Sequence, residues 1–95
     1  MRWIWDPPKD RSNRRAHGLG FETASLVFDD PLAVSRLDDT AEKERWQTVG
    51  EIGGVIVFVV HTWPAPDRNG EETGRIISAR KATAHERKAY EEGEF

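Results

Sequence analysis

The fold is decided by the stretch Gly53-Gly54-Val55-Ile56-Val57-Phe58-Val59-Val60, in which an unbroken apolar run follows a pair of glycines. β-Branched and aromatic residues favour strands, and a strand without polar alternation is typically covered on both faces. Gly53 and Gly54, with Gly50 before them, supply the backbone freedom for a hairpin connection. We therefore expect residues 55–60 to form the central strand of a sheet.

Four further segments have the composition of strands, and they lie on both sides of the central run. The loop Pro64–Gly74, rich in proline, glycine and charge, separates the central strand from the last of them. The four predicted strands are Arg2–Trp5, Leu32–Leu37, Glu44–Val49 and Arg75–Lys81. Because most of the connections are short, we expect a small, mostly antiparallel sheet.

Three segments predict helices. Asp10–His17 is polar, has Asp10 or Ser12 as an N-cap and stops at Gly18, so we expect a short exposed helix. Phe21–Phe28 has apolar residues at helical spacing, and Thr83-Ala84-His85-Glu86 matches a capping box that opens a helix running to about Glu92. The predicted class is α+β in the order β-α-α-β-β-β-β-α, with the helices on one face of the sheet.

The composition limits the kind of protein. A chain of 95 residues suits one small domain, here residues 1–95, and the absence of cysteine excludes disulfides and a cysteine nucleophile. The start of the chain lacks an apolar segment and contains Pro7 and Pro8, and no apolar run is long enough to span a membrane. We therefore expect a cytoplasmic protein without membrane contact.

The net charge of -3 gives the whole molecule no attraction to nucleic acid, so any nucleic-acid site must be a local patch. Basic residues do cluster near both ends of the chain, although such clusters are also typical of ordinary solvated surfaces. The clusters consist of Lys9, Arg11, Arg14 and Arg15, and of Arg75, Arg80, Lys81, Arg87 and Lys88.

An ordered series of short motifs runs through nearly the whole chain. The first half contains Trp5-Asp6-Pro7, Asn13, His17-Gly18, Phe21-Glu22-Thr23-Ala24 and Val27-Phe28-Asp29-Asp30-Pro31-Leu32. The second half contains Glu44-Arg45-Trp46, Gly50, Val60-His61-Thr62, Arg75-Ile76-Ile77-Ser78-Ala79-Arg80-Lys81-Ala82, Glu86-Arg87 and Tyr90. This series resembles the BrnT family of toxins, and the strand-then-helix pattern after Arg75 is its most specific part.

The resemblance implies a RelE-like fold and an endoribonuclease that inhibits translation. It also implies neutralisation by a BrnA-like antitoxin, whose ribbon-helix-helix part binds operator DNA, so that the toxin reaches DNA only indirectly. Two positions depart from the family pattern, because Ala16 stands where a lysine is common and Trp63-Pro64 stands where a charged residue is common.

Ribonuclease chemistry without a metal needs a base for the ribose 2′-hydroxyl, cations for the phosphorane-like transition state and an acid for the leaving oxygen. Arg45 and Arg80 are our first candidates for the cations, since a guanidinium donates two hydrogen bonds to a phosphate and stays charged. For proton transfer the candidates are His17, His61 and Glu44.

Each proton-transfer candidate also has a structural interpretation: His61 could satisfy a loop carbonyl, His17 could stabilise a helix end, and Glu44 could form a salt bridge. For RNA binding we expect Arg75, Lys81 and Trp63. Side chains alternate along a strand, so Arg75 and Lys81 should share one face and Ser78 and Arg80 the other. The two pairs could line the same face only if the strand twists or bulges.

No spacing of histidines and carboxylates resembles a metal site, so we expect no metal and no other cofactor. A second hypothesis remains, namely a non-catalytic protein-interaction module that acts with a DNA-binding partner in transcriptional autoregulation. The net negative charge and the lack of one decisive catalytic motif motivate it.

Overall fold

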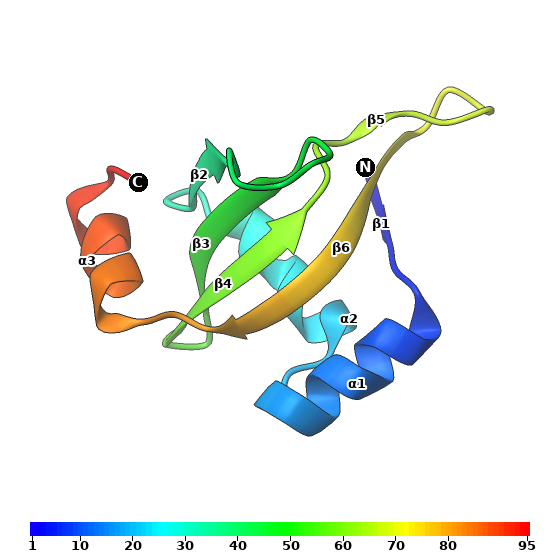
Figure 1. Ribbon diagram of the computed structural model, residues 1–95. Coiled ribbons are helices and arrows are strands. Elements are labelled where there is room, and N and C mark those ends of the chain that lie inside the picture. The colour runs from blue at the N-terminus through cyan, green and yellow to red at the C-terminus, as the bar shows by residue number, and fades with distance from the viewer.

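The computed structural model describes all of residues 1–95. They are organised around a six-stranded, mostly antiparallel sheet (Figure 1). The elements are β1 (Arg2–Ile4), α1 (Pro7–His17), α2 (Phe21–Ala24), the 3₁₀ helix η1 (Ser25–Asp29), β2 (Val34–Leu37), β3 (Trp46–Ile52), β4 (Val55–His61), β5 (Ala65–Pro66), β6 (Glu72–Lys81) and α3 (Ala84–Glu92). The sheet order is β1-β6-β4-β3-β2, with β5 paired to β6, and only β1 runs parallel to its neighbour. The predicted α+β class is confirmed.

The central hairpin matches the expectation, except for one glycine. β3 and β4 pair along their whole lengths, and the turn between them consists of Gly53 and Gly54, with φ angles of 54° and 85°. Gly50 is not part of this connection, because it lies inside β3 opposite Val57. A side chain at Gly50 would collide with Val27 of η1, so this glycine serves close packing rather than a turn.

The first helix begins earlier than predicted. α1 starts at Pro7 with Asp6 as its N-cap residue, whereas the sequence suggested a start near Asp10 or Ser12. The N–H groups of a first helical turn have no partner within the helix, so proline, which lacks this group, is tolerated there. Pro7 and Pro8 therefore begin the helix instead of only ending the preceding strand. The carboxylate of Asp10 instead accepts a 2.8 Å hydrogen bond from the Phe21 amide and so joins α1 to α2.

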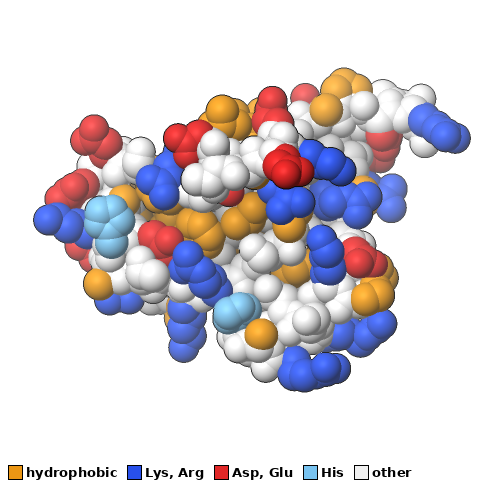
Figure 2. Space-filling model, in the orientation of Figure 1, with side chains coloured by type: hydrophobic (Ala, Val, Ile, Leu, Met, Phe, Trp, Pro, Cys, Tyr) orange, Lys and Arg blue, Asp and Glu red, His pale blue; other side chains and the backbone are white.

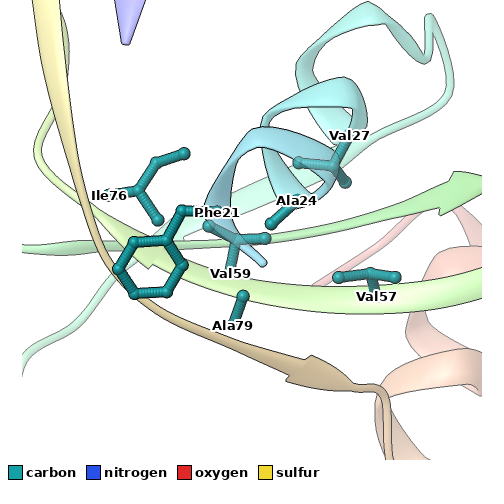
Figure 3. Close-up of a cluster of buried hydrophobic side chains, with 7 residues drawn as sticks. All are labelled: Phe21, Ala24, Val27, Val57, Val59, Ile76 and Ala79. Atoms are coloured by element: carbon teal, nitrogen blue, oxygen red, sulfur yellow. The ribbon is translucent and has the colours of Figure 1, made fainter. Parts of the chain in front are cut away.

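The main hydrophobic core lies between the sheet and the helices α2 and η1 (Figure 3). The helices contribute Phe21, Ala24 and Val27, and the expected helix over 21–28 is therefore realised as α2 followed by η1. The strands contribute Val57, Val59, Ile76 and Ala79. Burying these side chains is the dominant stabilising contribution to a domain of this size.

The last helix packs on the opposite face, which corrects the expectation that all helices share one face. Val49 and Phe58 form a second small core with Ala82, and Tyr90 of α3 packs against it. Val49 pairs with Phe58 across the hairpin, whereas the main core holds Val57 and Val59, so the two clusters lie on different faces. The predicted capping box is confirmed, with Thr83 as N-cap and Glu86 as its partner.

The starts of three strands differ from the sequence interpretation. β2 starts at Val34 and β3 at Trp46, each two residues later than expected, so Glu44 and Arg45 precede the strand. β6 starts at Glu72 and takes up the end of the expected loop, which also contains β5. No helix of the protein is long and apolar enough to span a membrane.

Candidate active site

A cleft of about 610 Å³ opens where the β1–α1 junction, the segment before β3 and the start of β6 meet. We call it the basic cleft. Its lining residues are Trp5, Asp6, Pro7, Lys9, Lys43, Glu44, Arg45, Thr62, Arg75, Ile76 and Ile77. Three of the sequence-predicted site residues, Glu44, Arg45 and Arg75, are therefore brought together in one hollow.

The charge of this cleft is mainly positive. Four cations line it, Lys9, Lys43, Arg45 and Arg75, against two carboxylates. None of the four cations forms an ion pair with an acidic side chain of the protein, since the only ion pairs involve other lysines and arginines. The cleft therefore has more cations than carboxylates, and this excess of positive charge suits a phosphate ligand. In the space-filling view, lysine and arginine side chains lie beside the apolar centre of the face shown, together with several carboxylates (Figure 2).

A bulge in β6 turns Arg75 toward the cleft. Val60 pairs with Ser78 but His61 pairs with Ile76, so one extra residue lies in β6 at this point. As a result Ile76 and Ala79, three residues apart, face the same core, and Arg75 lies on the other side of the strand with Arg80. The expectation that Arg75 and Lys81 share a face is therefore wrong.

The backbone around the cleft is fixed by hydrogen bonds. The Arg75 amide donates to the Thr62 hydroxyl at 2.9 Å, and the Thr62 amide donates to the Arg75 carbonyl at 2.9 Å. The Arg45 carbonyl accepts a 2.7 Å bond from the Asp38 amide, which closes the loop that presents Lys43 and Glu44. Both arginines thus project from anchored backbone.

Sequence reasoning missed Lys9 and Lys43 as cleft residues. Lys9 was visible only as a member of the N-terminal basic cluster, and its place in the cleft depends on α1 starting at Pro7. Lys43 lies in the segment before β3 and had no motif signal at all. The two lysines double the number of cations that the sequence had pointed to at this site.

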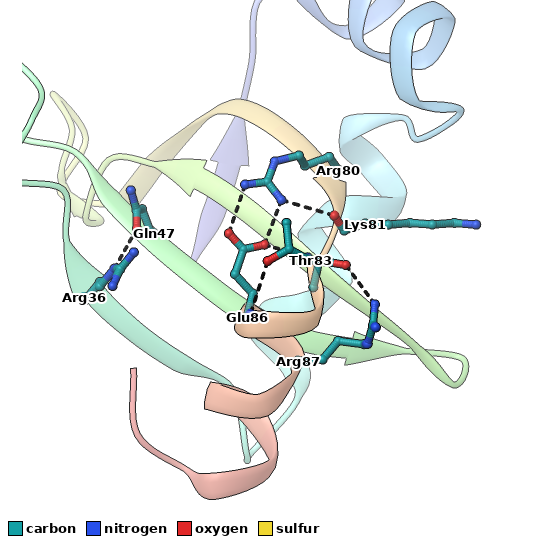
Figure 4. A network of polar contacts seen from close by, with 8 residues as sticks. Arg36, Gln47, Arg80, Lys81, Thr83, Glu86 and Arg87 are labelled. Carbon is teal, nitrogen blue, oxygen red and sulfur yellow. Dashed lines mark hydrogen bonds and ion pairs between the residues drawn. The ribbon is translucent and has the colours of Figure 1, made fainter.

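Arg80 lies on the same sheet face but is occupied by another contact. Its guanidinium donates two hydrogen bonds to the Glu86 carboxylate, at 2.7 and 2.9 Å (Figure 4). It also lies 4.1 Å from the centre of the Phe58 ring. Burial alone would raise the pKa of Glu86, but the bonds from Arg80 and Thr83 outweigh it and leave the pKa lowered. Arg80 therefore ties α3 to the sheet.

His61 is fully buried below the other face of the sheet. Its Nε2 lies 2.6 Å from the Thr48 hydroxyl, its Nδ1 lies 2.8 Å from the Thr62 carbonyl, and its ring meets Trp3 and Phe28 edge-on. Burial lowers the pKa of His61. His61 therefore satisfies a loop carbonyl, which is the structural interpretation that the sequence analysis left open.

The other predicted residues lie outside the basic cleft. His17 ends α1, eight residues from Lys9, which is roughly 12 Å along a helix. Lys81 lines a separate apolar hollow with Leu19 and Val57. Trp63 is 53% exposed and stacks at a tilt on Trp46, with ring centres 4.8 Å apart.

No group of three or more His, Asp or Glu side chains is placed to hold a metal ion. The residues of the basic cleft instead supply cations from the chain itself, through guanidinium and ammonium groups. A carboxylate, Glu44, stands among them and accepts a long, 3.4 Å hydrogen bond from the Trp46 indole.

Comparison with known proteins identifies the family. A search of curated proteins found no match to this chain. A family model described as the ribonuclease toxin BrnT of type II toxin-antitoxin systems matches residues 5–86. That match covers most of the chain, including every residue of the basic cleft, and it makes RNA the substrate and an antitoxin the partner. The chain therefore belongs to the BrnT family of ribonuclease toxins.

Proposed function

We propose that this ribonuclease toxin binds the RNA backbone in the basic cleft and cleaves it there without a metal ion. The observation that carries the proposal is that Glu44 and four cations line one cleft, and that none of these cations forms an ion pair within the protein. A cleft with this charge and volume suits a phosphodiester and the ribose next to it.

Each step of the cleavage has a group available in the cleft. Glu44 takes the proton of the 2′-hydroxyl, and that oxygen attacks the adjacent phosphorus as the bond to the 5′-oxygen breaks. Arg45 and Arg75 donate hydrogen bonds to the phosphate oxygens as negative charge accumulates. The ammonium group of Lys9 or Lys43 protonates the leaving 5′-oxygen. The products are a 2′,3′-cyclic phosphate and a 5′-hydroxyl.

Purified protein, free of antitoxin, tests this assignment directly. RNA incubated with the wild type in the presence of a chelator should give fragments that end in 2′,3′-cyclic phosphate. Glu44→Gln should lower the cleavage rate by roughly 10²- to 10⁴-fold, as expected for loss of a general base. Glu42→Gln removes a charge from an exposed residue outside the cleft and should cleave normally. Full activity of Glu44→Gln would remove Glu44 from the mechanism.

We also propose that the antitoxin is BrnA-like, with a ribbon-helix-helix part, and that it covers the basic cleft. The unpaired cations of the cleft support this, because an acidic antitoxin segment would neutralise them and exclude RNA at once. Co-expression with the neighbouring open reading frame should give a stable complex that shifts operator DNA, whereas the toxin alone should not. Absence of a complex would contradict the proposal.

A further inference from the structure

A second cavity, of about 430 Å³, lies on the other side of the β4–β5 junction from the basic cleft. We call it the aromatic pocket. Three aromatic side chains line it, and two of them, Trp3 and Phe28, stack with their ring centres 3.8 Å apart. The third, Trp63, is 53% exposed and also lines the pocket. A flat, unsaturated ligand would fit such walls.

The charge of the aromatic pocket differs from that of the basic cleft. It has no lysine or arginine in its lining, and its two charged side chains, Asp30 and Glu72, are acidic. The two carboxylates disfavour a phosphate in this pocket but do not disfavour an uncharged ring. The pocket therefore suits a nucleobase rather than the nucleic-acid backbone.

The polar groups of the pocket can be assigned donor and acceptor roles. A carbonyl can only accept, so His61 donates from Nδ1 to the Thr62 carbonyl and accepts at Nε2 from the Thr48 hydroxyl. Because the Thr48 proton is used there, Ser35 donates to the Thr48 oxygen across 2.7 Å. The Ser35 oxygen then has only acceptor capacity left for a ligand.

The carboxylates extend this pattern. The oxygens of Asp30 already accept hydrogen bonds from the Leu32 amide, the Glu51 amide and the Tyr90 hydroxyl. Glu72 forms no ion pair, and no hydrogen bond involves its carboxylate, which is therefore free to accept. Ser35 and Glu72 therefore both offer hydrogen-bond acceptors to a ligand edge that carries donors.

The two sites are joined by contacts between their walls. Glu44 of the basic cleft accepts from the Trp46 indole, and Trp46 lies against Trp63 of the aromatic pocket. Thr62 lines the basic cleft, and its neighbours His61 and Trp63 line the aromatic pocket. The basic cleft could therefore bind a phosphate of a single-stranded RNA while the aromatic pocket binds an adjacent base.

We propose that the aromatic pocket is a base-recognition subsite, in which Trp63 stacks on an unpaired nucleobase and Glu72 accepts from its amino edge. Guanine fits best, because its N1–H and N2 amino group form two parallel donors for one carboxylate, whereas uracil presents carbonyl acceptors on both sides of its single donor. This inference rests on cleavage in the basic cleft and gives that site its sequence preference.

Binding of uncleavable RNA separates this subsite from the cleavage site. Two 2′-O-methyl tetranucleotides, UUGU and UUUU, are titrated into antitoxin-free protein and followed by calorimetry. The wild type should bind UUGU more tightly, by roughly tenfold, as one bidentate base contact provides. Glu72→Gln should abolish that preference, whereas Glu71→Gln, an equal charge change outside the pocket, should keep it. Trp63→Ala should weaken both complexes by roughly five- to a hundredfold.

The possible outcomes distinguish the two proposals. Unchanged affinities and preference in Trp63→Ala and Glu72→Gln would overturn the base-recognition subsite, while cleavage in the basic cleft would stand. If these variants lost antitoxin binding but kept RNA binding, the base-recognition subsite would also be overturned. The pocket would then be a binding site for a basic side chain of the antitoxin. Arg75→Ala should weaken both tetranucleotides equally, and normal affinity and cleavage by that variant would contradict the proposed cleavage site.

Discussion

Tyr90 illustrates how single side chains join distant parts of this chain. Its hydroxyl donates a 2.6 Å hydrogen bond to Asp30, and this contact raises the pKa of Tyr90 to about 12. Because the folded pKa lies above the unfolded value, the stabilisation is complete below about pH 10 and is lost as the pH rises from there to about 12. Tyr90 is also the only tyrosine of the chain, so a tyrosinate signal reports this one side chain.

Absorbance titration at the tyrosinate band tests this contact. The wild type should stay protonated at pH 10.5 to 11, and Asp30→Asn should move the midpoint down toward the ordinary value of about 10. Asp29→Asn, an exposed neighbour, serves as the control and should behave like the wild type. A wild-type midpoint near 10 would show that the hydrogen bond is absent in solution.

Glu86 gives a second prediction for a single residue. Its lowered pKa means that the carboxylate stabilises the fold above the unfolded value of about 4.3, and that this stabilisation is lost as the pH falls through the folded pKa. Urea unfolding between pH 6 and 3 should therefore show a weaker acid dependence in Glu86→Gln than in the wild type. Glu91→Gln, on an exposed position of α3, should keep the wild-type slope.

At the level of single residues, the sequence predicted part of the candidate site. Glu44, Arg45 and Arg75 could be chosen because they lie beside strand motifs, and they do line one cleft. Arg80 looked equivalent, because residue type and spacing do not reveal that Glu86 occupies its guanidinium. Histidine chemistry alone could not indicate that His61 lies below the sheet. The contacts that distinguish these residues come from other elements of the fold, so the local sequence does not show them.

Among the elements, α1 depends on one buried asparagine. The Asn13 amide donates to the carbonyls of Leu19 and Ala79, at 2.8 and 2.7 Å, and its oxygen accepts from the Ala79 amide at 3.2 Å. β1 pairs with β6 only as far as Arg75, so Ala79 lies on the free edge of β6 and Asn13 takes the place of a neighbouring strand. The side chain thus attaches α1 to the sheet.

Removing this side chain should leave buried backbone groups without partners. Asn13→Ala should lower the free energy of unfolding by about 2 to 4 kcal/mol, since each unsatisfied buried group costs about 1 to 3 kcal/mol. Ser12→Ala on the exposed side of α1 provides the control and should change it by less than about 0.5 kcal/mol. Equal urea midpoints for Asn13→Ala and the wild type would contradict this role.

The elements also show where local pattern is sufficient. The central hairpin and the capped last helix were predicted from residues within a few positions of each other, and both are confirmed. The predicted start of α1 was wrong because proline is allowed in the first turn of a helix as well as in a loop that ends a strand. The β6 bulge, which sets the direction of Arg75, depends on pairing with β4 and has no local signal.

For the whole molecule, the distribution of charge matters more than its sum. The net charge is -3, yet four cations without internal partners line one cleft. Binding of RNA there should release counterions from the phosphates, and the affinity should fall as salt rises. If two phosphates are held, the logarithm of the affinity should fall with the logarithm of salt with a slope of about -1.4.

This salt dependence can be assigned to the cleft by mutation. An uncleavable single-stranded RNA should lose affinity with salt less steeply when Arg75→Ala removes one cation of the cleft. Lys88→Ala on α3, whose ammonium group pairs with Glu92, should leave the slope unchanged. A slope near zero for the wild type would rule out an electrostatic RNA site on this face.

The central claim is that RNA is cleaved in the basic cleft and not at Arg80. The most direct measurement compares the cleavage rates of Arg75→Ala and Arg80→Ala, each at a temperature where circular dichroism shows it folded. We expect Arg75→Ala to lose roughly 10²- to 10³-fold in rate without losing stability, because a transition-state cation is removed. Arg80→Ala should lose about 1 to 3 kcal/mol of stability and cleave at nearly the wild-type rate. A folded, inactive Arg80→Ala beside a fully active Arg75→Ala would contradict the account.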